Sequence, residues 1–143
     1  MKAIPDYPHC FVCGDKNKKG LNIRFFAHDG KAKAEFTPTQ EFEGYKDILH
    51  GGIISTLLDE VMIKSILAQG ILTITTQIDV KFKNSARIGE KLYLEGEVTE
   101  NKSKIIMTKG KVFKEDGTIV AAATGKFYRA TGDMKRRLEG SLT

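Results

Sequence analysis

One apolar helix followed by four long alternating segments is the feature that most limits how this chain can fold. Residues 51–69 place apolar side chains at three- and four-residue spacing, the period of an α-helix, and Gly70 follows as a stop signal. From Leu72 onward the apolar period falls to two, as in a strand with one buried face. Short turns join the four segments, so we expect antiparallel neighbours. These segments cover residues 72–83, 92–98, 105–114 and 119–129.

The residues before the helix add two more strands. Leu21–Ala27 has strand composition, Asp29-Gly30 is a hairpin turn, and Lys31–Thr37 alternates small or apolar residues with charges. The order of elements is then strand, strand, helix and four strands. One helix cannot cover both faces of such a sheet, so it must lie on one concave face. We expect an α+β fold with one long central helix wrapped by a six-stranded antiparallel sheet.

The remaining segments predict no second domain. Residues 1–20 are expected to be irregular, residues 39–50 to form a polar loop, and residues 130–143 to form a polar tail with a short helix around Met134–Leu138. The whole chain, residues 1–143, is expected to be one domain. The face or edge of the sheet that the helix leaves open is expected to be buried by a second subunit.

The composition excludes several classes of function. The apolar stretch around the helix contains charged residues, so it does not predict a membrane span, and the first residues lack a secretory pattern. We therefore expect a cytoplasmic protein with no membrane partner. The net charge of +5 suits an anionic ligand. Basic residues are scattered and aromatic ones lie mostly in strands, so a nucleic-acid partner is not expected.

Cys10 and Cys13 are the two cysteines of the chain. One C-x-x-C pair is half of a zinc site, which needs four ligands, and the sequence contains no second pair. Two chains could share a zinc ion, or His9 and His28 could contribute. The simpler interpretation is two reduced thiols in a tight turn that ends at Gly14. We expect the pair to be structural or incidental, and no metal to be required.

The start of the helix carries the first candidate for chemistry. His50 precedes Gly51 and Gly52, and paired glycines allow another backbone or a ligand to approach closely. The first turn of a helix has unpaired N–H groups and a partial positive charge. Gly51 and Gly52 are therefore natural donors to a carbonyl oxygen that becomes negative during acyl transfer. A plain helix start, with His50 as cap or packing residue, is the alternative.

Two neighbouring acids in mid-helix differ in their surroundings. Glu60 lies one turn before Lys64, and the pair predicts an ordinary solvated salt bridge. Asp59 has no such partner on the helix. A carboxyl group held among apolar side chains has a raised pKa, which suits a general base near neutral pH. The alternatives are an Asp at the rim of the fold that reaches water, or one paired across a subunit boundary.

Taken together, these residues resemble a known family. The stretch H-G-G-I-I-S-T-L-L-D-E on the single helix, with C-F-V-C-G and N-K-K-G-L upstream and T-P and F-E-G before the His, resembles the hotdog-fold acyl-CoA thioesterases. It looks closest to the phenylacetyl-CoA-type branch of the 4-hydroxybenzoyl-CoA thioesterase superfamily. The resemblance spans about residues 9–129. It implies hydrolysis of an acyl-coenzyme A thioester to free acid and CoA, in a homodimer or homotetramer with sites between subunits.

The resemblance also implies residue roles. Asp59 matches the catalytic acid, as general base or nucleophile, and Gly51 matches the glycine whose amide polarises the thioester carbonyl. His50 matches the His that orients this turn. Thr75, with Thr76 as a fallback, matches a Ser or Thr that assists the water from the partner subunit. Gly44 stands where many members carry Asn, so that contribution must be absent or replaced.

Coenzyme A enters as part of the substrate, and no further cofactor is implied. Lys83 and Arg87 are expected contacts for its phosphates, and Gly52 is expected to lie against it. Two other functions stay open. One is a non-catalytic module that binds acyl-CoA or an acyl carrier. The other is a hydratase or dehydratase on the same fold, which would use His50 only if its ring faces the substrate.

Overall fold

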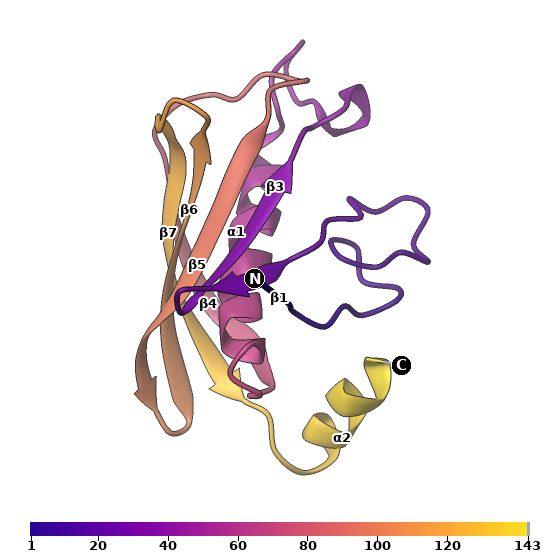
Figure 1. Ribbon diagram of the computed structural model, residues 1–143, viewed down its shortest axis with the longest axis vertical. Coiled ribbons are helices and arrows are strands. Elements are labelled where there is room, and N and C mark those ends of the chain that lie inside the picture. Colours follow the sequence, from indigo (N-terminus) through magenta and orange to yellow (C-terminus); the bar gives the residue numbers. More distant parts are fainter. Residues whose placement is uncertain (143) are drawn as a thin grey trace.

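A computed structural model describes residues 1–142 and shows a long helix lying on one face of an antiparallel sheet (Figure 1). In these residues the sheet has seven strands, in the order β1-β2-β3-β5-β6-β7-β4, and all neighbours are antiparallel. The elements are β1 (Lys2–Ala3), β2 (Phe26–His28), β3 (Lys31–Phe36), the 3-10 turn η1 (Gln40–Phe42), α1 (Gly51–Leu67), β4 (Thr73–Phe82), β5 (Leu92–Lys102), β6 (Ile105–Lys114), β7 (Ile119–Arg129) and α2 (Gly132–Ser141). The expected hotdog architecture, a single helix wrapped by an antiparallel sheet, is confirmed.

The predicted bounds of the strands agree well with the structure after the helix and less well before it. The expected strands 105–114 and 119–129 coincide with β6 and β7, and Gly70, at φ +79°, closes the turn after α1. The prediction of six strands is wrong by one, because the backbone of Lys2 and Ala3 pairs with β2. The polar tail forms a helix of ten residues, α2, which is longer than expected and contains no buried residue.

The segment Leu21–Ala27 is mostly not part of the sheet. Only its last two residues belong to β2, because the N–H groups of Leu21 and Ile23 donate to the carbonyls of Phe11 and Val12 instead. The hairpin at Asp29-Gly30 is confirmed, with φ values of +53° and +74°. Residues 4–25 thus form a folded N-terminal segment of their own, whereas the sequence predicted residues 1–20 to be irregular and residues 21–27 to be a strand.

This N-terminal segment determines how deeply α1 is buried. It lies against the side of α1 that faces away from the sheet (Figure 1), and its buried side chains join the same hydrophobic core as the helix. Along α1 even Lys64 and Ser65 are buried. The helix is therefore the middle of three layers, between the sheet and the N-terminal segment.

Close contact between α1 and the sheet depends on a glycine in β5. A methyl group added at Gly96 would lie 2.4 Å from the carbonyl oxygen of Val61, and real side-chain atoms essentially never come that close. The helix backbone therefore rests directly on the strand backbone at this point. This contact fixes the position of the middle of α1, where Asp59 and Glu60 lie.

No helix among residues 1–142 is long and apolar enough to cross a membrane.

Candidate active site between Asp59 and Thr75

The structure brings Asp59 of α1 and Thr75 of β4 together. The Thr75 hydroxyl donates a hydrogen bond of 2.8 Å to Asp59 Oδ1. Asp59 is half-buried, and burial raises the pKa of its carboxyl group, while the bond from Thr75 lowers it and so limits the increase. The direction of this pKa shift agrees with the prediction for Asp59, and the Thr75 hydroxyl is a polar neighbour that the sequence did not place beside it. A carboxyl of this kind, with one oxygen held and the other open, can accept a proton from water.

Thr75 faces α1 by the ordinary alternation of a strand, because it lies two residues after the buried Thr73. The register between β4 and β7 shifts only after this point, between Thr75 and Gln77, so Thr76 is an extra residue in the ladder. Among the described residues, the hydroxyl that bonds to Asp59 is that of Thr75 and not that of Thr76, the fallback for its role. We expected Asp59 to be served by Thr75 of the partner subunit. The structure differs from this expectation, because the Thr75 hydroxyl donates to Asp59 of its own chain.

The start of α1 forms a second group of candidate residues. His50 caps the helix, because its Nδ1 accepts a hydrogen bond of 2.8 Å from the Gly52 N–H. The expectation that Gly52 contacts the cofactor is therefore not supported, as its amide already has an acceptor. The Gly51 N–H has no protein acceptor within residues 1–142. Gly51 is exposed, and its amide is free to bind a ligand oxygen.

The loop that carries the two expected phosphate contacts lies beside this helix start. The Leu49 N–H donates to the Ala86 carbonyl at 2.9 Å, and the Ile88 N–H donates to the Asp47 carbonyl at 3.0 Å. Lys83 and Arg87 are both exposed in this loop. Their charges and the positive end of α1 thus belong to one surface of the chain, which suits an anionic ligand.

Within one chain, however, Gly51 and Asp59 do not meet. They are eight residues apart on a straight helix, which at 1.5 Å per residue is about 12 Å along its axis. One thioester carbonyl cannot contact both groups of the same α1. The sequence-based prediction took both from one chain, whereas this separation favours a Gly51 amide from another subunit, which is a matter for proposal.

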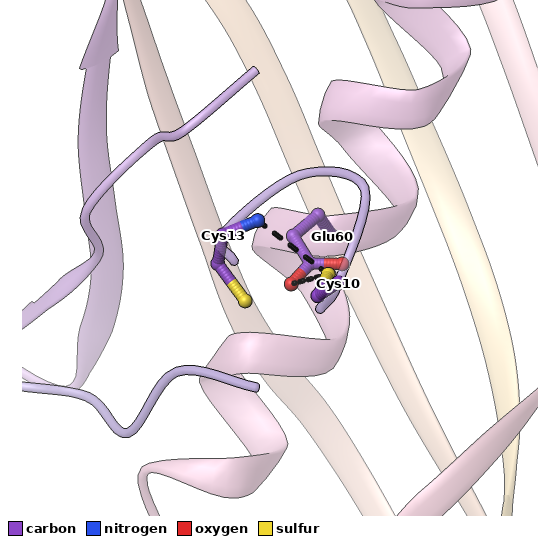
Figure 2. A group of neighbouring side chains, drawn as sticks. All are labelled: Cys10, Cys13 and Glu60. Carbon is purple, nitrogen blue, oxygen red and sulfur yellow. Dashed lines mark hydrogen bonds between the residues drawn. The ribbon is translucent and has the colours of Figure 1, made fainter. Parts of the chain in front are cut away.

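Another side of α1, about 100° around the helix axis from Asp59, holds a second polar cluster, which sequence reasoning missed. Glu60 faces the N-terminal segment, where its Oε2 lies 3.8 Å from Cys10 Sγ (Figure 2). The donor atoms of Cys10, Cys13 and Glu60 all lie within 4.8 Å of one another. Burial raises the pKa of Glu60 to about 7. The expected solvated salt bridge between Glu60 and Lys64 is wrong, because the Lys64 side chain is only 1% exposed.

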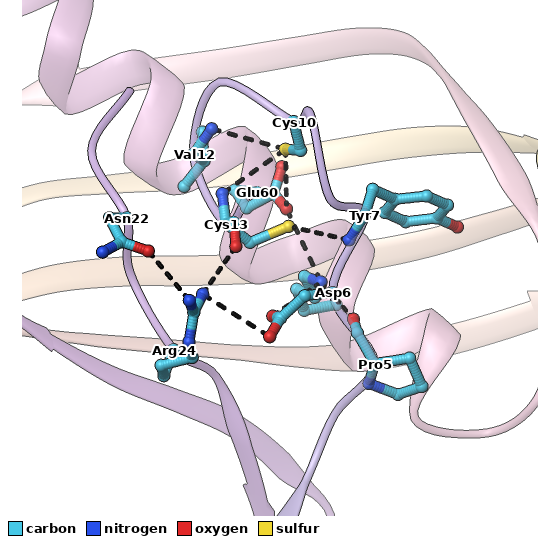
Figure 3. Close-up of polar contacts among 10 residues, drawn as sticks. Pro5, Asp6, Tyr7, Cys10, Val12, Cys13, Asn22, Arg24 and Glu60 are labelled. Carbon is cyan, nitrogen blue, oxygen red and sulfur yellow. Dashed lines mark hydrogen bonds and ion pairs between the residues drawn. The ribbon is translucent and has the colours of Figure 1, made fainter. Parts of the chain in front are cut away.

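Lys64 is the positive centre of this cluster. Its Nζ lies 3.9 Å from Glu60 and 3.8 Å from Asp6, and it donates to the Pro5 carbonyl. Figure 3 shows how Arg24 closes the other side, donating to the Cys13 carbonyl at 2.6 Å and pairing with Asp6 at 3.5 Å. The sequence offered one signal for this cluster, the C-x-x-C pair, but gave no reason to connect it with the helix.

A single long helix packed on one face of an antiparallel sheet is the arrangement of the hotdog-fold thioesterases. The chain belongs to the Thioesterase superfamily, whose profile matches residues 46–121, just over half of the chain. The match includes the helix start, Asp59, Thr75 and the basic loop. It does not include the N-terminal segment.

Proteins that are similar to this chain in sequence or in structure are consistent with this family. The chain is 27% identical over 114 residues to acyl-coenzyme A thioesterase THEM5 of Mus musculus, which covers 78% of the chain and 46% of the mouse protein. The chain therefore spans less than half of that relative. Among solved structures, a thioesterase superfamily protein superimposes with a TM-score of 0.81 at 24% identity, over 85% of the chain and 60% of that protein. The E. coli PaaI protein from the phenylacetic acid degradation operon superimposes with a TM-score of 0.75 at 21% identity. The match covers 82% of the chain and 86% of the PaaI protein.

A thioesterase protein of Streptococcus pneumoniae also shares the fold. Its structure with coenzyme A gives a TM-score of 0.72 at 18% identity, over 76% of the chain and 89% of that protein. Two further structures of the streptococcal protein carry alanine in place of a threonine and in place of an aspartate, at positions 16 residues apart. At these identities the similarity shows the fold, and any transfer of ligand or residue roles is a matter for proposal.

Proposed function

We propose that this thioesterase hydrolyses an acyl-coenzyme A, with Asp59 activating the attacking water. The observation that carries the proposal is the hydrogen bond from Thr75 to Asp59 Oδ1. It fixes the carboxyl group, leaves the second oxygen open, and accompanies a pKa raised by burial. The same separation of 16 residues between Asp and Thr in the streptococcal variants supports this pair.

The active site is composite in this proposal. Asp59 and Thr75 come from one subunit, and Gly51 of the partner subunit supplies the amide. The reason is that Asp59 and Gly51 of the same helix are about 12 Å apart along its axis. The exposed edge of the sheet supports such a dimer. In contrast to β3 and β6, β4 shows no regular burial on one face, and its outer edge has no strand neighbour among residues 1–142. Pairing of two β4 edges would cover it.

The reaction is then a hydrolysis with balanced proton transfers. Asp59 takes a proton from water as the oxygen attacks the thioester carbonyl carbon. The carbonyl oxygen becomes negative and accepts the N–H of Gly51 of the partner subunit. Collapse of this intermediate breaks the carbon–sulfur bond, and the proton held by Asp59 goes to the leaving thiolate. Asp59 could instead attack the carbonyl directly, with water hydrolysing the resulting anhydride.

Substrate recognition would use the surface beside the helix start. Lys83 and Arg87 lie in the loop that is hydrogen-bonded to residues 47–49, and they can contact the phosphates of coenzyme A. In this proposal the coenzyme A part of the substrate binds to the subunit that supplies Gly51. The acyl group would then extend toward Asp59 of the other subunit.

A thiol-release assay with short, long and aromatic acyl-CoAs tests the proposal. The wild-type chain should release free CoA with at least one of them, and Asp59→Asn should abolish the release. Turnover that survives Asp59→Asn would overturn the role of Asp59. Binding without thiol release across the panel would support the non-catalytic module, and an enoyl product without free thiol would identify a hydratase or dehydratase.

A further inference from the structure

We infer that Cys10, Cys13 and Glu60 form a zinc-binding site that fixes the N-terminal segment to helix α1. The site is separate from the proposed chemistry, because Glu60 lies on the side of α1 that faces away from the sheet. The sequence-based expectation of a metal-free pair rested on the lack of a further ligand. The fold supplies one from position 60, and neither His9 nor His28 belongs to the group.

The spacing of the donor atoms suits one ion. With Zn–S near 2.3 Å and Zn–O near 2.1 Å, tetrahedral geometry puts neighbouring donors about 3.6–3.8 Å apart. Cys10 Sγ and Glu60 Oε2 are 3.8 Å apart, and no pair of the three donors exceeds 4.8 Å. Movements of about 1 Å or less would therefore surround a zinc ion, with water as the fourth ligand.

The backbone already orients both sulfur atoms toward this point. Cys10 Sγ accepts the N–H groups of Val12 and Cys13 at 3.3 and 3.4 Å, and Cys13 Sγ accepts the N–H of Tyr7 at 3.4 Å (Figure 3). Such bonds favour a thiolate at Cys10, the form that binds metal, whereas Cys13, whose thiol pKa is raised by the neighbouring Cys10 sulfur and by burial, would release its proton when the ion binds. The turn also requires glycine at position 14, where a methyl group would lie 2.5 Å from the Cys10 nitrogen and the Pro8 oxygen.

The buried charges balance when the ion is present. Two thiolates and one carboxylate carry three negative charges, while Zn²⁺ and the fully buried Lys64 carry three positive ones. Asp6 and Arg24, which border the cluster, neutralise each other at 3.5 Å. Since buried charge is costly unless it is paired, Lys64 compensates the one negative charge that two thiolates and a carboxylate would have in excess of Zn²⁺. Mixed thiolate and carboxylate donors suit zinc, which is intermediate in softness.

Metal content of the untagged full-length chain, purified under reducing conditions, tests the inference. We expect about one zinc per chain by mass spectrometry. Cys10→Ser, Cys13→Ser and Glu60→Gln should each lower zinc affinity at least about tenfold. The matched control His9→Ala, an exposed residue adjacent to Cys10, should keep its zinc. Circular dichroism on each variant verifies that it folds.

Substitution of cobalt for zinc provides a spectroscopic test that needs no variant. Because the chain has only these two cysteines, thiolate-to-cobalt charge-transfer absorption in the wild-type protein must come from this pair. Removal of zinc by a chelator should lower the thermal midpoint by about 5 °C or more, with recovery when zinc is restored. The inference is overturned if the reduced protein keeps less than about one tenth of a zinc per chain after incubation with excess zinc. It is equally overturned if the cysteine variants retain zinc, or if the pair occurs only as a disulfide.

Discussion

Thr75 and Asp59 are joined by a hydrogen bond of 2.8 Å within one chain, from the bulged part of β4 to the middle of α1. This bond makes the acid and its supporting hydroxyl one unit, carried by one subunit. The glycine amide at the start of the same helix lies about 12 Å away along the axis. The two halves of the proposed chemistry are therefore separable by mutation, and each can be tested alone.

Asp59→Asn is expected to reduce kcat by about 10²–10⁴-fold, the usual contribution of a general base. Asn keeps the shape of the side chain and can still accept the Thr75 bond, but it cannot take a proton. Thr75→Val should cost about tenfold, the equivalent of one hydrogen bond. Asp15→Asn, at an exposed position, is the matched control and should leave kcat unchanged. A wild-type rate for Asp59→Asn would contradict the assignment.

Gly51→Pro is expected to lower kcat by about 10²–10³-fold, because proline removes the N–H that would bind the oxyanion. Proline is favoured in the first position of a helix. His50, at φ −62° and ψ 132°, already has the conformation that a residue before proline prefers. Helix content by circular dichroism should therefore match wild type, so that lost activity reports on the missing amide. Full activity in this variant would exclude the Gly51 amide.

Mixing impaired variants distinguishes the composite site from a single-chain one. A mixed dimer of Asp59→Asn and Gly51→Pro chains has one site with both lesions and one intact site. Random pairing should restore about one quarter of wild-type activity if each chain makes one site. A mixture of Asp59→Asn and Thr75→Val chains should show no more than the mean of the two separate activities, because both lesions lie on the same half of the site and no intact site forms. Recovery in the second mixture but not in the first would contradict the proposed arrangement.

The pH dependence of stability should reveal the cost of keeping Asp59 ionised. Burial raises the pKa of Asp59 above its unfolded value, so this group contributes stability at low pH and loses it as pH rises through the folded-state pKa. Asp59→Asn should therefore melt at a higher temperature than wild type at pH 7. The difference should shrink as pH falls below the unfolded pKa. Thermal melts of both proteins between pH 3.5 and 7.5 measure this, and a variant that is less stable at pH 7 would contradict it.

Gly96→Ala is expected to destabilise the fold by about 1–3 kcal/mol, the usual range for overpacking. The added methyl group would meet the Val61 carbonyl at 2.4 Å, and the helix backbone cannot move away without disturbing its neighbours. Gly140→Ala is the matched control, since a methyl group there meets nothing within 4 Å and the change should stay within about 1 kcal/mol. Urea unfolding measures both variants, and equal stabilities would mean that α1 shifts freely on β5.

The order of the elements, the helix and the later strands followed from sequence alone, because hydrophobic period is a local property of the chain. His50, Gly51 and Asp59 could be singled out for the same reason, since a helix start and a lone carboxyl on a helix face are visible in neighbouring residues. The extra strand β1 and the folded segment 4–25 were not visible. Both depend on backbone pairing, which leaves no periodic signal.

Only the tertiary structure decided the environment of the polar side chains. Glu60 and Lys64 form an ordinary surface pattern on an isolated helix, and the N-terminal segment turns them into a buried cluster with Cys10 and Cys13. Thr75 reaches Asp59 because β4 packs beside α1 in the fold. Sequence spacing fixes which residues share a helix face or a strand face. Burial and long-range contact depend on what packs against that face, and this is set by parts of the chain far away in sequence.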